Sequence, residues 1–354
     1  MKRYKIVILP GDGIGPEVMD SALSVLDIIS RKYNFKIDII HEVAGGESID
    51  QYGEPITDSV LQSCVDSDAV LLGAVGGAKW DSLPQDKKPE KGLLSLRKLL
   101  GLYSNLRPAK IFKSLIDASS LKSGVIIDSD IMVVRELTGG IYFGTPRGFD
   151  EEKGFNTLTY EKFEVERISK VAFEIAKTRK KKVVSVDKSN VLDSSQFWRN
   201  VVHKVHENYT DIHLSNMYVD NAAMQLVQNP KQFDVIVTQN LFGDILSDIT
   251  AMITGSLGML PSASIGDKHA MYEPVHGTAP EIQGKNKANP IAMISSVGMM
   301  LEHTMKNFDA SNDINNAIES VLEMGFRTPD IYTDGCQKVN NSKLTSEIIN
   351  LLEN

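Results

Sequence analysis

The chain alternates short apolar runs with stretches of helical periodicity along most of its 354 residues, and this alternation restricts the folds open to it. The first apolar run, residues 5–9, ends in Pro-Gly-Asp-Gly, and Pro16 opens a stretch whose apolar positions recur at helical spacing. This pattern predicts a strand, a tight turn and an amphipathic helix. Because its repetition places helices on both faces of a sheet, we expect an α/β protein with a mostly parallel sheet flanked by helices.

The same patterns locate the other elements. Apolar runs predict strands at 36–44, 69–75, 125–127, 131–134, 183–187, 214–219 and 234–238. Helical spacing predicts helices at 91–100, around 165–175, and at 192–207, 221–228, 240–253, 316–324 and 344–352, with another beginning at Pro290. The glycine-rich segment 139–155 is expected to project from the body of the protein as an arm.

The length of the chain exceeds the usual size of one compact core, so two domains are expected. Hydrophobic residues make up 42% of the sequence and charged residues 24%, the balance of a globular protein. The 38 basic and 46 acidic residues give a net charge of −8, which offers no general attraction to nucleic acid. An acidic ligand would therefore require local arginines.

The cysteine count and the apolar runs bear on the compartment. Cys64 and Cys336 are too few for a disulfide framework, and we expect both to be buried, reduced thiols. No apolar stretch reaches the roughly 18 residues that a membrane span requires, since even 288–301 contains two serines and a glycine. These features predict a cytoplasmic protein with no membrane and no nucleic acid partner.

The glycine-rich turn at 11–16 matches a dinucleotide-binding fingerprint only in part. The Gly-x-Gly-x-x-Gly pattern requires a glycine at position 16, where this chain has Pro16. Proline suits the first position of a helix, so the turn is predicted to join a strand to a helix. A Rossmann fold is not expected.

One predicted helix combines leucines with charged side chains on a single face. Glu90, Leu93, Leu94 and Arg97 stand at i, i+3, i+4 and i+7, a spacing that brings them to the same side. A ligand with a branched apolar group beside a carboxylate would fit this face. The alternative is an ordinary amphipathic helix with a Glu–Arg pair at the surface.

Two further arginines end apolar segments. Arg107 stands in Asn-Leu-Arg-Pro and Arg135 in Val-Val-Arg-Glu. The planar guanidinium group binds a carboxylate through two hydrogen bonds. Convergence of these two side chains with Arg97 would hold a dicarboxylate.

Acidic residues suggest a metal site. Asp244 and Asp248 stand at i and i+4, so both carboxylates leave the same face of a predicted helix. A divalent cation would offset their repulsion, and hard oxygen ligands favour Mg²⁺ or Mn²⁺. Asp220, at the end of a predicted strand, would complete the set. The alternative is a solvated pair of surface carboxylates.

Lys188 and a glycine-containing loop are two further candidates. Lys188 follows the strand predicted at 183–187, and the carboxyl ends of strands carry the sites of α/β enzymes. A lysine near a metal and arginines would serve as a general base, while the alternative is a surface lysine beside Asp187.

The loop at 276–290 contains glycines and leads into a predicted helix, whose first backbone amides could bind phosphates. The alternative is an ordinary irregular loop.

Taken together, these motifs resemble the β-decarboxylating dehydrogenases, the family that includes isocitrate and isopropylmalate dehydrogenases. The match spans nearly the whole chain. Its markers are Leu-Pro-Gly-Asp-Gly-Ile-Gly-Pro-Glu at 9–17, Asn-Leu-Arg-Pro at 105–108, Arg-Glu-Leu-Thr-Gly-Gly-Ile-Tyr-Phe-Gly at 135–144, Asp-Lys-Ser-Asn-Val-Leu at 187–192, Asn-Leu-Phe-Gly-Asp-Ile-Leu-Ser-Asp at 240–248 and Glu-Pro-Val-His-Gly-Thr-Ala-Pro at 273–280. Glu90 and the Gly-Leu-Leu-Ser-Leu-Arg run at 92–97 resemble the isopropylmalate branch, in which such residues line the alkyl pocket.

The resemblance implies an enzyme that oxidises and decarboxylates 3-isopropylmalate to 2-ketoisocaproate with NAD, in leucine biosynthesis. It implies that Lys188 and Tyr142 transfer protons and that Asp220, Asp244 and Asp248 hold Mg²⁺ or Mn²⁺. The residues implied at the substrate are Glu90, Leu93, Leu94, Arg97, Arg107, Arg135, Val191 and Asp220. The residues implied at the cofactor are Gly77, Glu90, His276, Gly277, Thr278, Ala279, Pro280, Glu281 and Asn289.

The resemblance also implies a two-domain fold and an assembly. Residues 1–102 with 255–354 would form a discontinuous domain on the cofactor side, and 103–254 would bind the metal and form the dimer. Two chains of the homodimer would share each active site, with Lys188 and Asp220 reaching into the neighbour's site.

Other readings of the same residues lead to different activities. Another family member acting on D-malate, tartrate or homoisocitrate would share the arginines and aspartates, and Glu90, Leu93 and Leu94 would discriminate it. A metal-dependent lyase or hydrolase would leave the loop at 276–290 without a role. A non-catalytic binding module would explain neither Lys188 nor Tyr142.

The acidic residue at position 281 predicts the choice of cofactor. The isopropylmalate branch usually has aspartate there, and this chain has Glu281, one methylene longer, with Thr278 where serine is commoner. A carboxylate accepts hydrogen bonds from a ribose 2′-hydroxyl and repels a 2′-phosphate. We therefore expect a higher kcat/KM with NAD⁺ than with NADP⁺ in steady-state assays, and the reverse order would contradict this assignment of Glu281.

Overall fold

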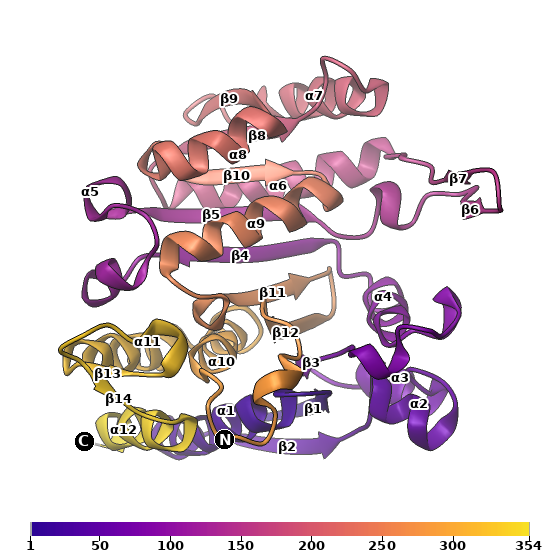
Figure 1. Ribbon diagram of the computed structural model, residues 1–354. Helices are drawn as coiled ribbons and strands as arrows, with labels where there is room; N and C mark the ends of the chain where they lie inside the picture. The colour runs from indigo at the N-terminus through magenta and orange to yellow at the C-terminus, as the bar shows by residue number, and fades with distance from the viewer. Residues whose placement is uncertain (1, 354) are drawn as a thin grey trace. The chain divides into compact units, whose positions relative to one another are not determined.

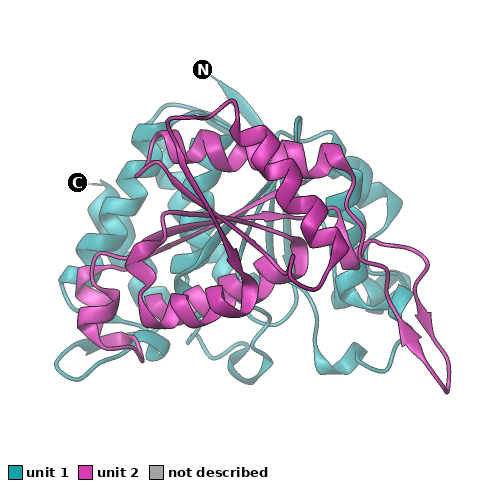
Figure 2. Ribbon diagram, turned by 90° about the horizontal axis from the view of Figure 1, so that it is seen from above, with its two compact units in different colours: residues 1–102, 255–354 teal, residues 103–254 magenta. Residues whose placement is uncertain are grey.

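The computed structural model describes residues 2–353, and the chain divides into two compact units. Unit 1 combines Met1–Leu102 with Gly255–Asn354, and unit 2 is Tyr103–Thr254 (Figure 2). Each unit contributes five neighbouring strands to the main sheet and has helices packed against them, and each unit is described separately.

The sheet of unit 1 has the strand order β2-β1-β3-β12-β11 (Figure 1). β1 is parallel to β2 and β3, β3 is parallel to β12, and β11 runs antiparallel to β12. The strands are β1 (Arg3–Gly11), β2 (Lys36–His41), β3 (Ala69–Ala74), β11 (Pro261–Ile265) and β12 (Ala270–Pro274). Every residue of β3 is buried, as expected for an apolar strand covered on both faces.

Helices and a small strand pair complete unit 1. The helices are α1 (Gly15–Lys32), α2 (Gly46–Tyr52), α3 (Asp58–Val65), α4 (Pro89–Leu99), α10 (Ile291–His303), α11 (Phe308–Glu323) and α12 (Asn341–Glu353), and β13 (Phe326–Arg327) pairs with β14 (Gln337–Lys338). α10 is apolar almost all round and nearly all of its residues are buried, which fits a helix in the middle of the unit. α1 packs against both α10 and α12.

The sheet of unit 2 has the order β4-β5-β10-β8-β9. β4 and β5 are antiparallel, and the pairs from β5 to β9 are parallel. The strands are β4 (Ser104–Lys110), β5 (Asp130–Glu136), β8 (Lys182–Asp187), β9 (His213–Tyr218) and β10 (Val235–Thr238), and the helices are α5 (Ser123–Ile126), α6 (Lys162–Lys177), α7 (Asp193–His206), α8 (Val219–Gln228) and α9 (Asn240–Thr254). α8 and α9 cover one face of this sheet and α6 lies behind it (Figure 1).

The predicted fold class is confirmed, because mostly parallel strands alternate with helices in both units. One predicted strand was wrong: residues 125–127 overlap the single helical turn α5, where Ile126 is buried in the core. A run of three apolar residues has no period, so it fits a helical turn and a strand equally. The strands β4, β11 and β12 were not predicted, because serine, asparagine and proline interrupt their apolar pattern.

Residues 148–155 form the projecting part of the predicted arm. β6 (Gly148–Phe149) and β7 (Gly154–Phe155) pair as a hairpin that stands away from the other elements of unit 2 (Figure 1). The side chain of Phe149 is 87% exposed. The beginning of the segment does not project, since Gly140 is buried.

The two cysteines are both free, and they differ in burial. Cys64 is buried, and burial raises the pKa of its thiol to about 12. Cys336 is only half-buried, so the expectation of burial was wrong for this residue. It lies in a bend directly before β14. Among residues 2–353, no helix combines the length and the apolar character needed to cross a membrane.

A buried ion pair ties together the amino-terminal ends of the unit 2 strands. Nε of Arg179 lies 2.8 Å from Oδ1 of Asp234, a carboxylate that is 1% exposed. Nη2 of the same guanidinium lies 2.9 Å from Oδ1 of Asp130, and Oδ2 of Asp234 accepts a hydrogen bond from the backbone of Lys182. One guanidinium thus joins β5, β8 and the residue before β10.

The replacement Arg179→Met should destabilise the protein by about 3–5 kcal/mol, because it leaves the Asp234 carboxylate buried without its cationic partner. The matched control is Arg31→Met, which removes an exposed i,i+4 pair with Asp27 and should cost less than about 1 kcal/mol. Urea denaturation at one protein concentration measures both. Equal losses for the two variants would show that the Arg179 cluster does not stabilise the unit.

Candidate functional site

Arg135, near the carboxyl end of β5, is an almost fully buried cation whose partners come from α9. Its Nη1 lies 2.5 Å from Oδ1 of Asp244, and its Nε and Nη2 donate to Oδ1 of Asn240 at 3.0 and 2.8 Å. Gly243 permits this approach, since a Cβ there would lie 2.6 Å from Cγ of Arg135. The first turns of α9 thus supply the pairing that a buried charge requires.

Arg107 reaches the same carboxylate from β4. Its Nη1 donates to Oγ of Ser247 at 2.6 Å and lies 3.5 Å from Oδ1 of Asp244. Its side chain is 8% exposed. Two of the three arginines predicted to converge, Arg107 and Arg135, therefore do so in unit 2.

Asp244 and Asp248 share one face of α9, as their spacing predicts. Partial burial raises the pKa of Asp248; Arg107 opposes this shift and the nearby Asp244 adds to it. Two adjacent carboxylates of this kind are hard donors that suit Mg²⁺ or Mn²⁺. Within residues 2–353, however, no three acidic, histidine or cysteine side chains gather closely enough to hold a metal. One chain thus brings together two of the three predicted ligands.

Tyr142 points at the same carboxylate. Its hydroxyl donates to Oδ2 of Asp244 at 2.9 Å, and its ring centroid lies 5.7 Å from Cζ of Arg135. Burial, followed by the negative charge of Asp244, raises the pKa of Tyr142. The phenol therefore keeps its proton at neutral pH, and Tyr142, Arg107 and Arg135 surround Asp244.

Lys188 and Asp220 form a separate group in unit 2. Lys188 follows β8 and Asp220 lies in the first turn of α8, with Nζ and Oδ1 3.0 Å apart. The hydrogen bond from Lys188 lowers the pKa of Asp220. The Asp220 side chain is 63% exposed, and Val191, in the turn after Lys188, is 70% exposed. Asp220 and Val191 thus lie at the surface of the single chain, and Lys188 is half-buried beside Asp220.

In unit 1, Arg97 is paired with a residue that the sequence did not single out. Its Nη2 lies 2.7 Å from Oε1 of Glu273, at the end of β12, and both side chains are about nine-tenths buried. Within the described part of the chain, Nε of Arg97 is buried without a hydrogen-bond partner. Buried polar groups are rarely left unpaired, so this guanidinium retains a donor that suits a ligand carboxylate.

The side chains on the predicted ligand-binding face of α4 are only partly exposed to solvent. Glu90 is exposed, and Leu93 and Leu94 are half-buried. Leu93 lines a small apolar cavity of about 10 Å³ inside unit 1 together with Leu96 from the same helix. Leu93 therefore contributes to packing, whereas Leu94 does not line this cavity.

The predicted cofactor loop connects β12 to α10. Gly277 and Glu281 are exposed, Ala279 has a left-handed backbone, and Pro280 opens a short 3-10 helix. Burial lowers the pKa of His276, so its ring is neutral at physiological pH, and within the described residues its Nε2 is buried without a partner. The ring thus has an unused hydrogen-bonding nitrogen.

Asn289, the last predicted cofactor residue, has its side chain engaged in structure. Its Oδ1 accepts from the backbone N–H of Ile291 at 3.0 Å, and its Nδ2 donates to Oδ2 of Asp330 at 3.0 Å. The first contact satisfies a free N–H at the start of α10. A cofactor contact through this side chain would have to compete with both bonds.

The turn at 11–15 connects the cofactor loop to other predicted site segments. The N–H of Ile14 donates to the carbonyl oxygen of Thr278 at 2.9 Å, and a Cβ at Gly13 would lie 2.1 Å from that oxygen. The carboxylate of Asp12 is buried and accepts from the backbone N–H groups of Gly46, Glu47 and Gly76 at 2.8, 3.0 and 2.8 Å. The segment before Gly77 and the loop at 276–281 are thus fixed by one turn.

Sequence reasoning missed three of these residues. Asp12 was read only as part of a strand-to-helix turn, and no local pattern indicates its bonds to the distant amides of Gly46, Glu47 and Gly76. Asn240 opens the motif that contains Asp244, yet no pattern indicates its amide contacts. Glu273 opens the family marker at 273–280, but no local pattern indicates its pairing with Arg97, which is distant in the chain.

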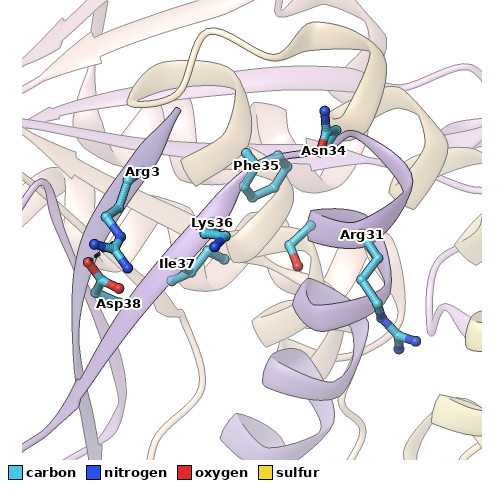
Figure 3. Close-up of a pocket in the computed structure, with 8 residues that line it drawn as sticks. Arg3, Arg31, Asn34, Phe35, Lys36, Ile37 and Asp38 are labelled. Atoms are coloured by element: carbon cyan, nitrogen blue, oxygen red, sulfur yellow. Dashed lines mark ion pairs between the residues drawn. The ribbon is translucent and has the colours of Figure 1, made fainter. Parts of the chain in front are cut away.

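A shallow hollow of about 520 Å³ lies elsewhere in unit 1, beside the end of α1 and the edge strand β2 (Figure 3). It contains none of the predicted site residues. Arg3 on its rim is already paired with Asp38, with Nε and Oδ2 3.0 Å apart. The hollow is therefore not assigned to the candidate site.

Comparison with known proteins identifies similar chains over the full length. The sequence profile of the family described as "Isocitrate/isopropylmalate dehydrogenase" matches residues 5–349. The chain is 61% identical over 351 residues to the 3-isopropylmalate dehydrogenase of Chlorobium chlorochromatii, covering 99% of this chain and 100% of that protein. It is also 61% identical over 347 residues to the 3-isopropylmalate dehydrogenase of Chlorobium luteolum, covering 98% of each.

A solved structure supports the same relationship. The isocitrate dehydrogenase from Methylococcus capsulatus aligns with a TM-score of 0.87 at 31% sequence identity. The alignment covers 99% of this chain and 100% of that one.

Proposed function

The chain belongs to the isocitrate/isopropylmalate dehydrogenase family, and from this premise we infer that it is an NAD-dependent dehydrogenase acting on 3-isopropylmalate. It oxidises (2R,3S)-3-isopropylmalate and removes CO₂ to give 2-ketoisocaproate, a step of leucine biosynthesis. High identity to curated 3-isopropylmalate dehydrogenases along the whole chain carries this conclusion. The cluster around Asp244 supplies matching chemistry: two cations for carboxylates, two acidic metal donors and a protonated phenol.

We propose that Arg107 and Arg135 bind the substrate carboxylates in unit 2, together with Arg97 of unit 1. The guanidinium forks orient both carboxylates and disfavour uncharged analogues. Glu90, Leu93 and Leu94 of α4 are proposed to recognise the alkyl group, with Val191 as a further contact. This apolar recognition distinguishes isopropylmalate from D-malate and tartrate, which lack the branched group.

Asp244 and Asp248, with Asp220, are proposed to hold Mg²⁺ or Mn²⁺, and NAD is proposed to bind at Gly77, Glu90, the loop 276–281 and Asn289. When bound, the cation stabilises negative charge on the substrate oxygen, and the nicotinamide accepts the hydride. The lone Nε2 of His276 and the exposed amides of its loop support an adenine- or phosphate-binding role.

Two side chains are proposed to move protons. Lys188 takes the proton of the C2 hydroxyl during oxidation, which requires the lysine to be neutral at that moment. After CO₂ leaves, Tyr142 gives its phenolic proton to the C3 carbon of the enolate and so forms the 2-oxo acid. The raised pKa of Tyr142 supports this acid role, because it keeps the hydroxyl protonated at neutral pH.

We further propose a homodimer with shared sites. Asp220 lies outside the Asp244–Asp248 pair in the single chain, so a second copy is proposed to supply it together with Lys188. Exposed apolar side chains on the two helices that carry the aspartates support an interface there: Met224 and Val227 on α8, and Ile245 and Met252 on α9. A cytoplasmic location is proposed as well, since both cysteines are free.

A panel of NADH-formation assays tests the activity. Isopropylmalate, isocitrate, D-malate and tartrate are compared at equal concentrations with NAD⁺ and Mg²⁺ or Mn²⁺. Isopropylmalate should give the highest kcat/KM. A higher value for any other substrate would assign the chain to a different activity within the family.

Leu94→Ala should weaken turnover of isopropylmalate by about 1–3 kcal/mol in kcat/KM, because it removes apolar contact with the alkyl group. Turnover of D-malate should change much less. Leu99→Ala is the matched control, since Leu99 lies on the same helix with its side chain 52% exposed. Leu93→Ala is less informative because Leu93 also packs inside unit 1. Equal losses on both substrates would show that Leu94 supports the fold and does not recognise the substrate.

Shared sites predict that two inactive variants restore activity when their subunits mix. If Lys188→Ala and Arg97→Ala are unfolded and refolded together, one site of a hybrid dimer receives both defects and the other receives neither. Activity should therefore reappear, although each parent is nearly inactive. Mixtures that demonstrably contain hybrids but stay as inactive as their parents would place both residues in one chain's site.

A further inference from the structure

The side-chain amide of Asn240 uses all of its hydrogen-bonding capacity within unit 2. Asn240 is completely buried at the start of α9. Its Oδ1 accepts from Nε and Nη2 of Arg135 at 3.0 and 2.8 Å. Its Nδ2 donates to the carbonyl oxygens of Leu137 and Gly139 at 3.2 and 3.1 Å. An amide group offers two acceptor and two donor positions, and here each one has a partner.

These contacts join two groups to which the proposed function gives different roles. Oδ1 holds the guanidinium that is proposed to bind a substrate carboxylate. Nδ2 holds the backbone that leads directly into the short turn Gly140–Tyr142, which carries the proposed acid. Both groups also reach Asp244, one helical turn after Asn240, through Nη1 of Arg135 and the hydroxyl of Tyr142.

Other contacts fix the position of Asn240 itself. Its backbone N–H donates to the hydroxyl of Tyr160 at 2.9 Å, and Tyr160 is buried. From the other side, the buried Glu136 accepts from the N–H of Gly139 at 2.7 Å. The backbone of Asn240 and the segment that its side chain contacts are thus each held by a further buried side chain.

We propose that Asn240 is a positioning residue that couples the Arg135 guanidinium to the Tyr142 turn, so that the substrate carboxylate and the proton donor are held in one arrangement. This inference rests on the proposed function. Asn240 touches neither substrate nor cofactor and acts through the two residues that do. Only a carboxamide serves this purpose, because one atom must accept from a cation while its neighbour donates to two carbonyl groups.

Two substitutions separate the two halves of this role. Asn240→Asp keeps an acceptor for Arg135 but turns an oxygen toward the carbonyls of Leu137 and Gly139, which releases the Tyr142 turn. We expect the KM for isopropylmalate to change less than about threefold and kcat to fall about tenfold or more. Asn240→Ala removes both halves, so KM should also rise about tenfold.

A double-mutant cycle distinguishes positioning from a general loss of structure. In a Tyr142→Phe background the hydroxyl that the turn positions is absent, so Asn240→Asp should lower kcat by less than about twofold there. Ser169→Ala is the control for a lost buried hydrogen bond in the same unit, and it should leave KM and kcat unchanged. Melting temperatures are measured for all variants.

These experiments test the proposed coupling by Asn240 independently of the proposed enzymatic activity. If Asn240→Asp lowers kcat by the same factor with and without the Tyr142 hydroxyl, or lowers only the melting temperature, the coupling is wrong. If Asn240→Ala does not fold, the Asn240→Asp cycle still decides. Wild-type turnover of isopropylmalate tests the proposed function alone, because the inference is judged from differences between variants.

Discussion

The burial of one positive charge, on Arg135, sets the requirements for the candidate site in unit 2. A guanidinium that is 2% exposed must be paired and hydrogen-bonded within the protein, or its burial would cost several kcal/mol. α9 meets this need with residues at i, i+3 and i+4: Asn240 accepts two hydrogen bonds, Gly243 leaves room and Asp244 provides the opposite charge. The side chains that are proposed to act on a ligand are thus already held by contacts that the fold of the unit requires. A site built in this way is preorganised, since its cations are oriented before any ligand arrives.

In unit 1, the buried charge that must be compensated is negative and belongs to Asp12. The carboxylate of Asp12 is buried, and burial raises its pKa, while three backbone N–H groups oppose that shift. Two of those amides, of Gly46 and Glu47, open α2, where a helix leaves its first N–H groups without partners, and the third belongs to Gly76 in the loop after β3. The same turn accepts close contact with Thr278 only because Gly13 has no side chain and adopts a left-handed backbone. The proposed cofactor segments therefore depend on one buried carboxylate and one glycine.

Some strands could be predicted from the sequence alone, whereas the contacts within the candidate site could not. Strands such as β3 and β10 are continuous apolar runs because both faces are covered, so periodicity alone found them. β4 was missed because Asn105, Arg107 and a proline interrupt its apolar pattern, and in the fold Arg107 donates to Oδ1 of Asn105. The proposed role of Tyr142 came only from the family resemblance, since no local spacing encodes it, whereas Lys188 was already a candidate base from its place after the strand predicted at 183–187. The contacts of Asn240 could not be predicted at all, because its partner Arg135 lies 105 residues away.

The pairing around Asp244 links the two ligands that the proposed function requires. In the single chain this carboxylate faces Arg135, Arg107 and the Tyr142 hydroxyl at once, so its charge is already balanced. A dicarboxylate bound to the two arginines would give them new anionic partners and leave Asp244 without its own. Asp244 and Asp248 would then repel each other more strongly, and a divalent cation would offset that repulsion. If binding of the substrate to the two arginines strengthened the binding of the cation, then bound cation would strengthen the binding of the substrate by the same free energy, because the two effects are linked. Under the proposed function, the arginine–aspartate pairs of unit 2 would therefore make occupation of the proposed carboxylate site and of the proposed metal site mutually dependent.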